Sequence, residues 1–132
     1  MKIEIPVENE SDRNWEKEWD YFKSIQDKNG FKAVWSIFDK GIKFDEKLPA
    51  GFEKIKAIVN SCSYFNYHIE LPLEGDTWLD LYKAANEAIV KSNDFHIYIE
   101  GFVVNPDPGL HSIQKSKLTH QEGEYLYIIT GS

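Results

Sequence analysis

Two histidine and glutamate pairs are the residues of this chain whose types and spacing could do chemistry. His68 lies two residues before Glu70, and His96 lies four before Glu100. Residues two apart on a strand share a face, so these four side chains could converge if their strands were neighbours. Two histidines with a carboxylate can hold a metal ion or perform general acid-base catalysis. The spacing is specific for neither and equally fits a solvated polar face, so we predict no catalytic residue, no metal site and no cofactor.

Tyrosines lie on the two predicted strands that carry these pairs and on the strand predicted at 124–130. They could be ordinary half-exposed strand residues, a patch for a partner or a second copy of the chain, or a surface on which a flat or cationic ligand stacks. The predicted binding residues share one face of the expected sheet and are Tyr64, Asn66, His68, Glu70, His96, Tyr98, Glu100, Tyr125 and Tyr127.

Composition and charge exclude several classes of protein. The chain has 22 acidic residues against 15 basic ones, of which only Arg13 is an arginine, so nucleic-acid binding is not expected. No apolar run approaches the roughly 18 residues of a membrane span. Glu4 and Pro6 fall where an export signal needs apolar residues, and Cys62 is the single cysteine. We therefore expect a cytoplasmic protein.

Hydrophobic periodicity defines the elements that must position these residues. Helices are expected at 11–29, ending at Asn29-Gly30, and at 77–92, where Thr77 and Asp80 fit a capping box. Gly101, inside a strand pattern, predicts a bulge. Alternation and β-branched or aromatic content predict strands at 2–8, 31–38, 52–60, 64–73, 95–104 and 124–130.

The two halves of the sequence resemble each other. KIEIPVENE at 2–10 matches HIELPLEGD at 68–76, and FKAVWSIF at 31–38 matches FHIYIEGF at 95–102. We predict one α+β domain, 1–132, made of two βαββ-type repeats at about 1–62 and 66–132. These would form a largely antiparallel sheet with both helices on one face. The strand residues expected to face the helices include Ala33, Trp35, Ile55, Ala57, Val59, Ile97, Ile99, Leu126 and Ile128.

The opposite face distinguishes the two halves. In the first half it would carry Lys32, Lys54 and Lys56, whereas the second half places histidines, carboxylates and tyrosines there. The sequence therefore favours a non-catalytic intracellular domain that binds a small ligand or a partner protein through the outer sheet face of the second repeat. One alternative is an acidic inhibitor or immunity-type protein that docks on a basic partner. Others are a small enzyme using the two histidine-glutamate pairs, and a homodimer joined through the tyrosine-rich face.

Overall fold

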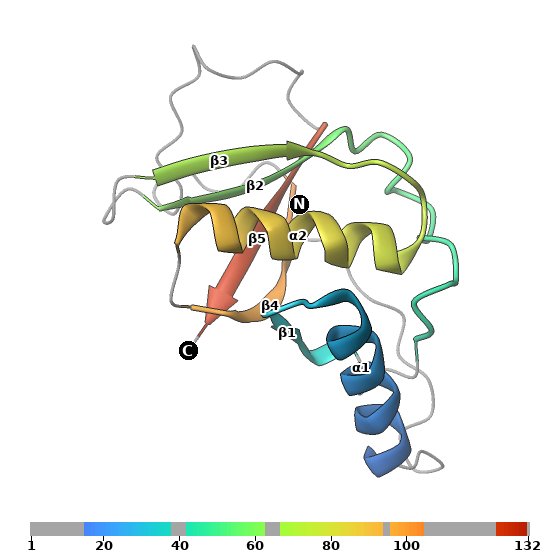
Figure 1. The fold of residues 1–132 in the computed structure, drawn as a ribbon. Helices are drawn as coiled ribbons and strands as arrows, with labels where there is room; N and C mark the ends of the chain where they lie inside the picture. The colour runs from blue at the N-terminus through green and yellow to red at the C-terminus, as the bar shows by residue number, and fades with distance from the viewer. Residues whose placement is uncertain (1–14, 38–41, 63–66, 94–95, 105–123, 132) are drawn as a thin grey trace.

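A mixed five-stranded sheet and two helices make up the part of the chain that the structure describes. The computed structural model describes residues 15–37, 42–62, 67–93, 96–104 and 124–131. The expected α+β class is confirmed, while the strand expected at 2–8 lies outside the described residues. In chain order the elements are α1 (Trp15–Asn29), β1 (Val34–Trp35), β2 (Ala57–Cys62), β3 (Tyr67–Pro72), α2 (Trp78–Ser92), β4 (Tyr98–Val103) and β5 (Tyr125–Gly131) (Figure 1).

The described sheet has the strand order β1-β4-β5-β2-β3. The β4–β5 and β2–β3 ladders are antiparallel, but β1 pairs with β4 and β2 with β5 in parallel. The sheet is therefore mixed rather than largely antiparallel. The predicted internal duplication is not confirmed by this order. In the second half β4 and β5 pair directly, whereas their counterparts β1 and β2 have two strands between them.

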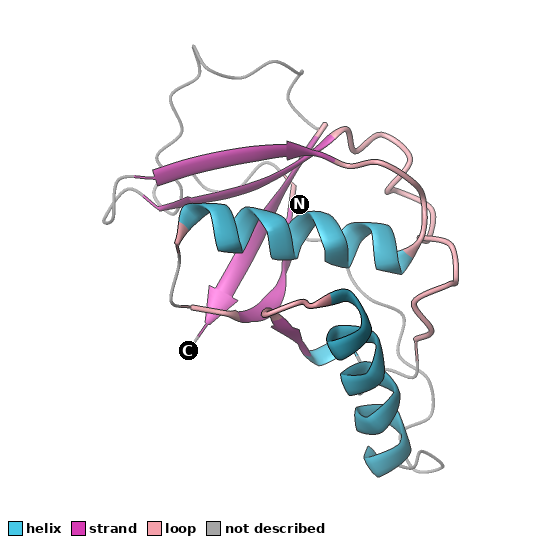
Figure 2. Cartoon of the chain, viewed as in Figure 1, coloured by secondary structure: helices cyan, strands magenta, loops and turns pink. Residues whose placement is uncertain are grey.

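Helix α2 begins and ends where its sequence predicts. The Thr77 hydroxyl accepts a hydrogen bond from the Asp80 amide, and the Asp80 carboxylate accepts one from the Thr77 amide, which completes the capping box. Asn93 ends the helix in the left-handed conformation. The helix lies over β2 and β3 (Figure 2). Helix α1 ends at Asn29, followed by Gly30 in the left-handed conformation as expected, and reaches the core at the β1 side through Phe22.

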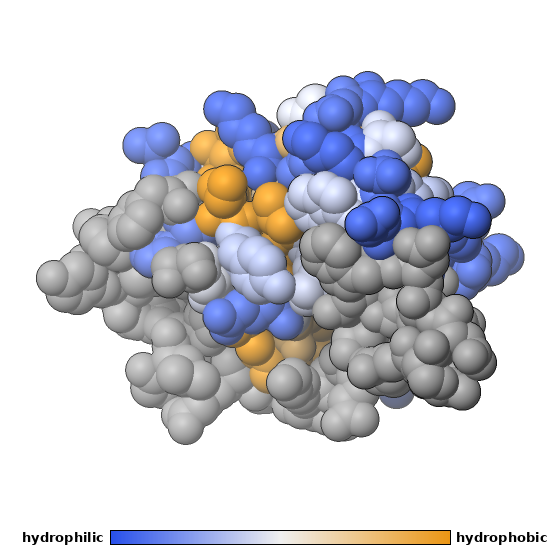
Figure 3. All heavy atoms as spheres, turned by 90° about the horizontal axis from the view of Figure 1, so that it is seen from below, coloured by the Kyte–Doolittle hydropathy of each residue, from blue (hydrophilic) through white to orange (hydrophobic). Residues whose placement is uncertain are grey.

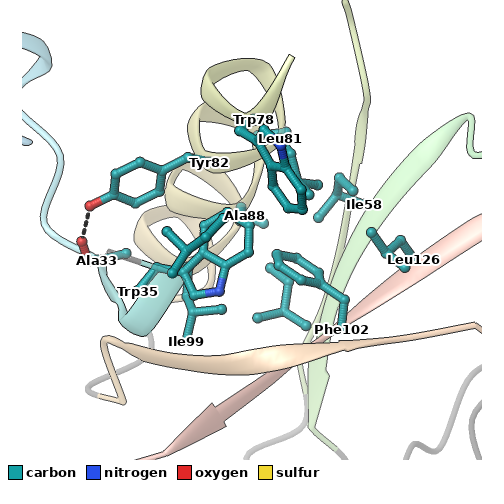
Figure 4. Close-up of a cluster of buried hydrophobic side chains, with 14 of the residues drawn as sticks. Ala33, Trp35, Ile58, Trp78, Leu81, Tyr82, Ala88, Ile99, Phe102 and Leu126 are labelled. Atoms are coloured by element: carbon teal, nitrogen blue, oxygen red, sulfur yellow. Dashed lines mark hydrogen bonds between the residues drawn. The ribbon is translucent and has the colours of Figure 1, made fainter. Parts of the chain in front are cut away.

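The main core lies between α2 and the sheet and is rich in aromatic rings. Trp78, Leu81 and Tyr82 point from α2 toward the sheet, where strand residues from β1, β2, β4 and β5 meet them (Figure 4). The Trp35 and Phe102 ring centroids are 5.2 Å apart, edge to face. The predicted helix-facing residues Ala33, Trp35, Ile55, Ile99, Leu126 and Ile128 all belong to this core.

Buried side chains bind the backbone that precedes β1. The Asn86 side-chain oxygen accepts hydrogen bonds from the amides of Lys32 and Ala33, at 2.8 and 3.0 Å. The Ala33 carbonyl accepts from Gln26 Nε2 at 2.9 Å and from the Tyr82 hydroxyl (Figure 4). Because these groups bond to helix side chains rather than to a neighbouring strand, the strand expected at 31–38 is reduced to two residues. Burial raises the pKa of Tyr82.

Candidate functional site

The two histidine-glutamate pairs do not converge. His68 and Glu70 lie on β3, while Glu100 lies on β4 and His96 just before it. Since β5 and β2 separate these strands, the pairs are roughly 14 Å apart across the sheet, at about 4.8 Å per strand. A shared acid-base or metal site would need the two pairs on neighbouring strands. In the described sheet β3 and β4 are not neighbours. Among the described residues, no three His, Cys, Asp or Glu side chains are grouped to hold a metal ion.

The tyrosines of β5 are packed rather than open to solvent. Tyr125 and Tyr127 are only 2% and 4% exposed, and their ring centroids are 6.2 Å apart. They form a second apolar cluster with Ala57 and Val59, against which Val103 packs. This cluster corrects the predicted orientation of β2, because Ile58 belongs to the main core under α2 while Ala57 and Val59 lie on the other side.

Two further candidates lie at opposite ends of the sheet order. Glu70 on β3 is half-buried and pairs in register with Val59, which in turn pairs with Tyr127, so Glu70 lies at the margin of the second apolar cluster. At the far end, Tyr98 on β4 pairs with Val34 of the edge strand β1. Tyr64 and Asn66 lie outside the described residues, and of His68 the structure describes only the backbone position.

The predicted bulge at Gly101 is confirmed. The β4–β5 register shifts between Ile99 and Gly101. Glu100 is exposed, and its carboxylate occupies the space that a Cβ on Gly131 would need. Ile97, expected to face the helices, is 43% exposed beside Tyr98 at 36%. One face of the described surface shows a small hydrophobic group bordered by strongly hydrophilic residues (Figure 3).

A cleft of about 360 Å³ lies where the loop before β2 meets the loop after β3. None of its described lining residues is among the binding residues predicted from the sequence. Its one sequence signal was the Leu48-Pro49-Ala50-Gly51 turn followed by apolar residues, and only the fold brings this turn beside the end of β3. The lining residues combine apolar side chains with three charged ones and are Lys47, Leu48, Pro49, Phe52, Glu53, Ile55, Leu73, Gly75 and Asp76.

Backbone hydrogen bonds hold one wall of the cleft against the start of α2. The Leu48 amide donates to the Asp76 carbonyl at 2.7 Å, and the Trp78 amide donates to the Glu46 carbonyl at 3.1 Å. The backbone amides of Trp78 and Leu79, at the start of α2, have no hydrogen-bond partner within the helix. Carbonyl groups of the loop before β2 accept their hydrogen bonds, which also holds this wall of the cleft in place. The Phe52 ring packs edge to face on Trp78, with centroids 5.9 Å apart. The apolar floor is therefore continuous with the main core.

The charged side chains of the cleft are an ion pair of Lys47 with Asp76 and a separate carboxylate, Glu53. Lys47 Nζ lies 3.6 Å from Asp76 Oδ2, and both side chains are largely exposed. The Glu53 carboxylate accepts a hydrogen bond from the Gly51 amide at 2.7 Å. Hydrogen bonds from the backbone amides of Glu53 itself and Gly51 lower the pKa of Glu53, and Lys54 adds to the effect. Glu53 is therefore ionised at neutral pH.

Comparison with known proteins identifies no relative. No family model, no curated protein and no solved structure gives a significant match to this chain. Neither helix in the described part of the chain has the length and apolar character required to cross a membrane.

Proposed function

We propose that this protein is a non-catalytic binding domain and that the cleft between the 47–55 loop and the 73–76 loop receives a small molecule. The observation that carries the proposal is the combination of a preformed hollow with an apolar floor and a few charged groups at its rim. Small-molecule sites typically enclose about 300–1,000 Å³ and combine apolar walls with a few polar groups, so this cleft has the size for a small ligand.

The surroundings of the floor support binding. Phe52 and Ile55 are buried members of the main core, and Phe52 rests on Trp78. A ligand would meet a surface already held in place by core packing and by the loop's bonds to α2. Binding to a preformed site requires little ordering of the protein, which favours affinity.

The lining residues support a binding role over a catalytic one. The described residues that line the cleft include no serine, cysteine or histidine. Of the two carboxylates, Glu53 has a lowered pKa, which makes it a weaker base than an ordinary glutamate. Asp76 lies 3.6 Å from Lys47, with which it forms an ion pair. The cleft thus offers contact area and fixed charge but no activated nucleophile.

The proposal is tested by titrating the full-length ¹⁵N-labelled protein with benzyl alcohol and following its amide resonances. The shifts should concentrate at Leu48, Phe52 and Ile55. Leu73→Arg places a long charged side chain at the cleft and should remove them, whereas Val90→Arg introduces the same side chain at an exposed site on α2, away from the lining. Shifts that avoid the cleft, or that persist in Leu73→Arg, would refute the proposal.

A second candidate is self-association at the β1 edge of the sheet. Ile97 and Tyr98 are adjacent and exposed there, and Glu100 lies on the same strand. This candidate keeps part of the tyrosine-bearing surface predicted from the sequence. Sedimentation of the protein at about 100 μM should show a dimer that Ile97→Lys dissociates, and a monomer at that concentration would exclude it. Cytoplasmic location, internal duplication and the acidic-inhibitor alternative stay predictions from the sequence.

A further inference from the structure

We infer that the ligand of this cleft is a small organic ammonium ion, with an apolar body against Phe52 and its charged nitrogen at Glu53. The inference rests on the proposed function and adds the chemical class of the ligand. It follows from how Glu53 is held, how the rim charges balance, and which kinds of cation the described residues can accommodate.

Glu53 is presented by the backbone of its own turn. The Gly51 amide holds its Oε2 atom at 2.7 Å, and the carboxylate remains open to water. The hydrogen bonds come from neutral amides, so they orient the carboxylate without neutralising its charge. A carboxylate fixed in this way can accept a hydrogen bond from a ligand N–H group without first losing much side-chain freedom.

Among the charged side chains at the rim, Glu53 is the one whose charge no other lining residue offsets. Among the lining residues, Lys47 and Asp76 face each other at 3.6 Å and offset one another. Lys54 lies close enough to favour the ionised form of Glu53, but it is not part of the lining. The described lining side chains therefore carry one net negative charge, which Lys54 reduces from outside the lining, so the cleft favours a cation over a neutral molecule or an anion.

The complementary cation is organic rather than metallic. Calcium takes six to eight oxygen ligands, and the described residues contain no group of three acidic, histidine or cysteine side chains that could hold a metal ion. The apolar residues Leu48, Phe52 and Leu73 occupy positions where a metal site would need polar ligands. An amine attached to a ring or a short aliphatic body matches both the floor and the rim.

Three probes of the same ring size and different charge test the inference. Benzylamine, benzyl alcohol and benzoate are titrated separately into the full-length ¹⁵N-labelled protein at pH 7, and the Kd of each is obtained from the shifts at the cleft. Benzylamine should bind roughly three- to tenfold more tightly than benzyl alcohol, and benzoate most weakly, as expected for one exposed charge-assisted hydrogen bond. The preference should fall as the salt concentration rises.

A pair of variants separates local recognition from overall charge. Glu53→Gln keeps an oxygen to accept from Gly51 but removes the negative charge, so it should equalise the Kd values of benzylamine and benzyl alcohol. Glu87→Gln makes the same change in net charge at an exposed residue of α2, away from both loops that form the cleft, and should preserve the preference.

The outcomes distinguish the two proposals. If none of the probes shifts the cleft resonances, the proposed function fails and this inference fails with it. If the alcohol or benzoate binds as tightly as the amine, or if Glu53→Gln keeps the preference, the cleft is a binding site but the ammonium inference is overturned. Loss of the preference in Glu87→Gln would also overturn it, because the selectivity would then come from net charge.

Discussion

Replacing Asn86 by leucine should destabilise the protein through two backbone amides rather than through lost volume. Leucine is close to asparagine in size, but it offers no acceptor to the amides of Lys32 and Ala33. Asn86 is 7% exposed, so water cannot readily take the place of its side-chain oxygen. The substitution therefore isolates the bonds that hold the segment preceding β1 against α2.

The magnitude follows from the surroundings of the two amides. The Ala33 bond is buried, and an unsatisfied buried donor costs about 1–3 kcal/mol. The Lys32 bond is partly buried, so its amide can recover some hydration, and about 1 kcal/mol is expected for its loss. Together they predict that the free energy of unfolding falls by about 3 kcal/mol, or that Tm falls by roughly 10 °C in a domain of this size.

Urea denaturation of the wild type and Asn86→Leu measures this loss, with Glu87→Leu as control. Glu87 is exposed on the next position of the same helix, so its replacement should change stability by less than about 0.5 kcal/mol. Amide hydrogen exchange gives the local readout. Ala33 should lose protection in Asn86→Leu by more than Leu126, which lies in the middle of the sheet.

A loss below about 1 kcal/mol in Asn86→Leu would refute the reasoning. So would equal losses of protection at Ala33 and Leu126, because the effect would then be global rather than centred on the bonds to Asn86.

The remaining predictions concern α2. Tyr82→Phe should cost about 1 kcal/mol at pH 7, because it removes the hydroxyl that bonds to the Ala33 carbonyl. Burial raises the pKa of Tyr82 above its usual 10.0, so its contribution is complete below pH 10 and declines as the pH rises further. The stability difference between the wild type and Tyr82→Phe should therefore shrink above pH 10 in urea titrations; a constant difference would contradict the assignment. Thr77→Ala should lower stability by about 1 kcal/mol through the lost cap, measured by thermal unfolding. Gly75→Ala should be at least as harmful, because Gly75 has a φ of 105° and an added Cβ would strike the Asp80 carboxylate; a neutral result would show that this carboxylate can move without loss.

Local chemistry made the ends of the helices predictable. The Thr77 and Asp80 pair and the Asn29-Gly30 sequence act within a few residues of themselves, and the structure places helix ends there. Gly101 likewise marked its bulge without information about a partner strand. These features depend on short-range backbone requirements, which a single sequence displays.

Which face of a strand is buried depends on the neighbouring elements, and a sequence alone does not show them. Residues 55–59 alternate apolar and basic side chains only as far as Ala57, after which Ile58 and Val59 are both apolar. A strand buried on both faces gives no decisive alternation, so the phase of β2 could be read either way. In β4 the alternation runs from exposed Tyr98 through buried Ile99 to exposed Glu100, and the bulge then makes Gly101 and Phe102 both buried.

The candidate site was predictable only in part for the same reason. Tyr98 and Glu100 are exposed on one strand, as the sequence suggested, but the strand order that separates Glu100 from Glu70 depends on long-range pairing. The cleft needs the 47–55 loop, the end of β3 and the start of α2 in one place. No local sequence pattern specifies that these three segments come together, although the apolar residues of the turn at 48–51 can be read from the sequence.

The position of β5 has a consequence for how the chain folds. Without this strand the described sheet separates into two pairs, β1 with β4 and β2 with β3, because β5 is the strand that joins them. Its parallel ladder with β2 matches Ala57 to Tyr125, a long closure in sequence that contributes to slow folding. A ribosome making this protein must therefore release residues 125–131 before the two pairs can join. Until then they expose unpaired strand edges, and this is the stage at which the nascent chain would most need a chaperone.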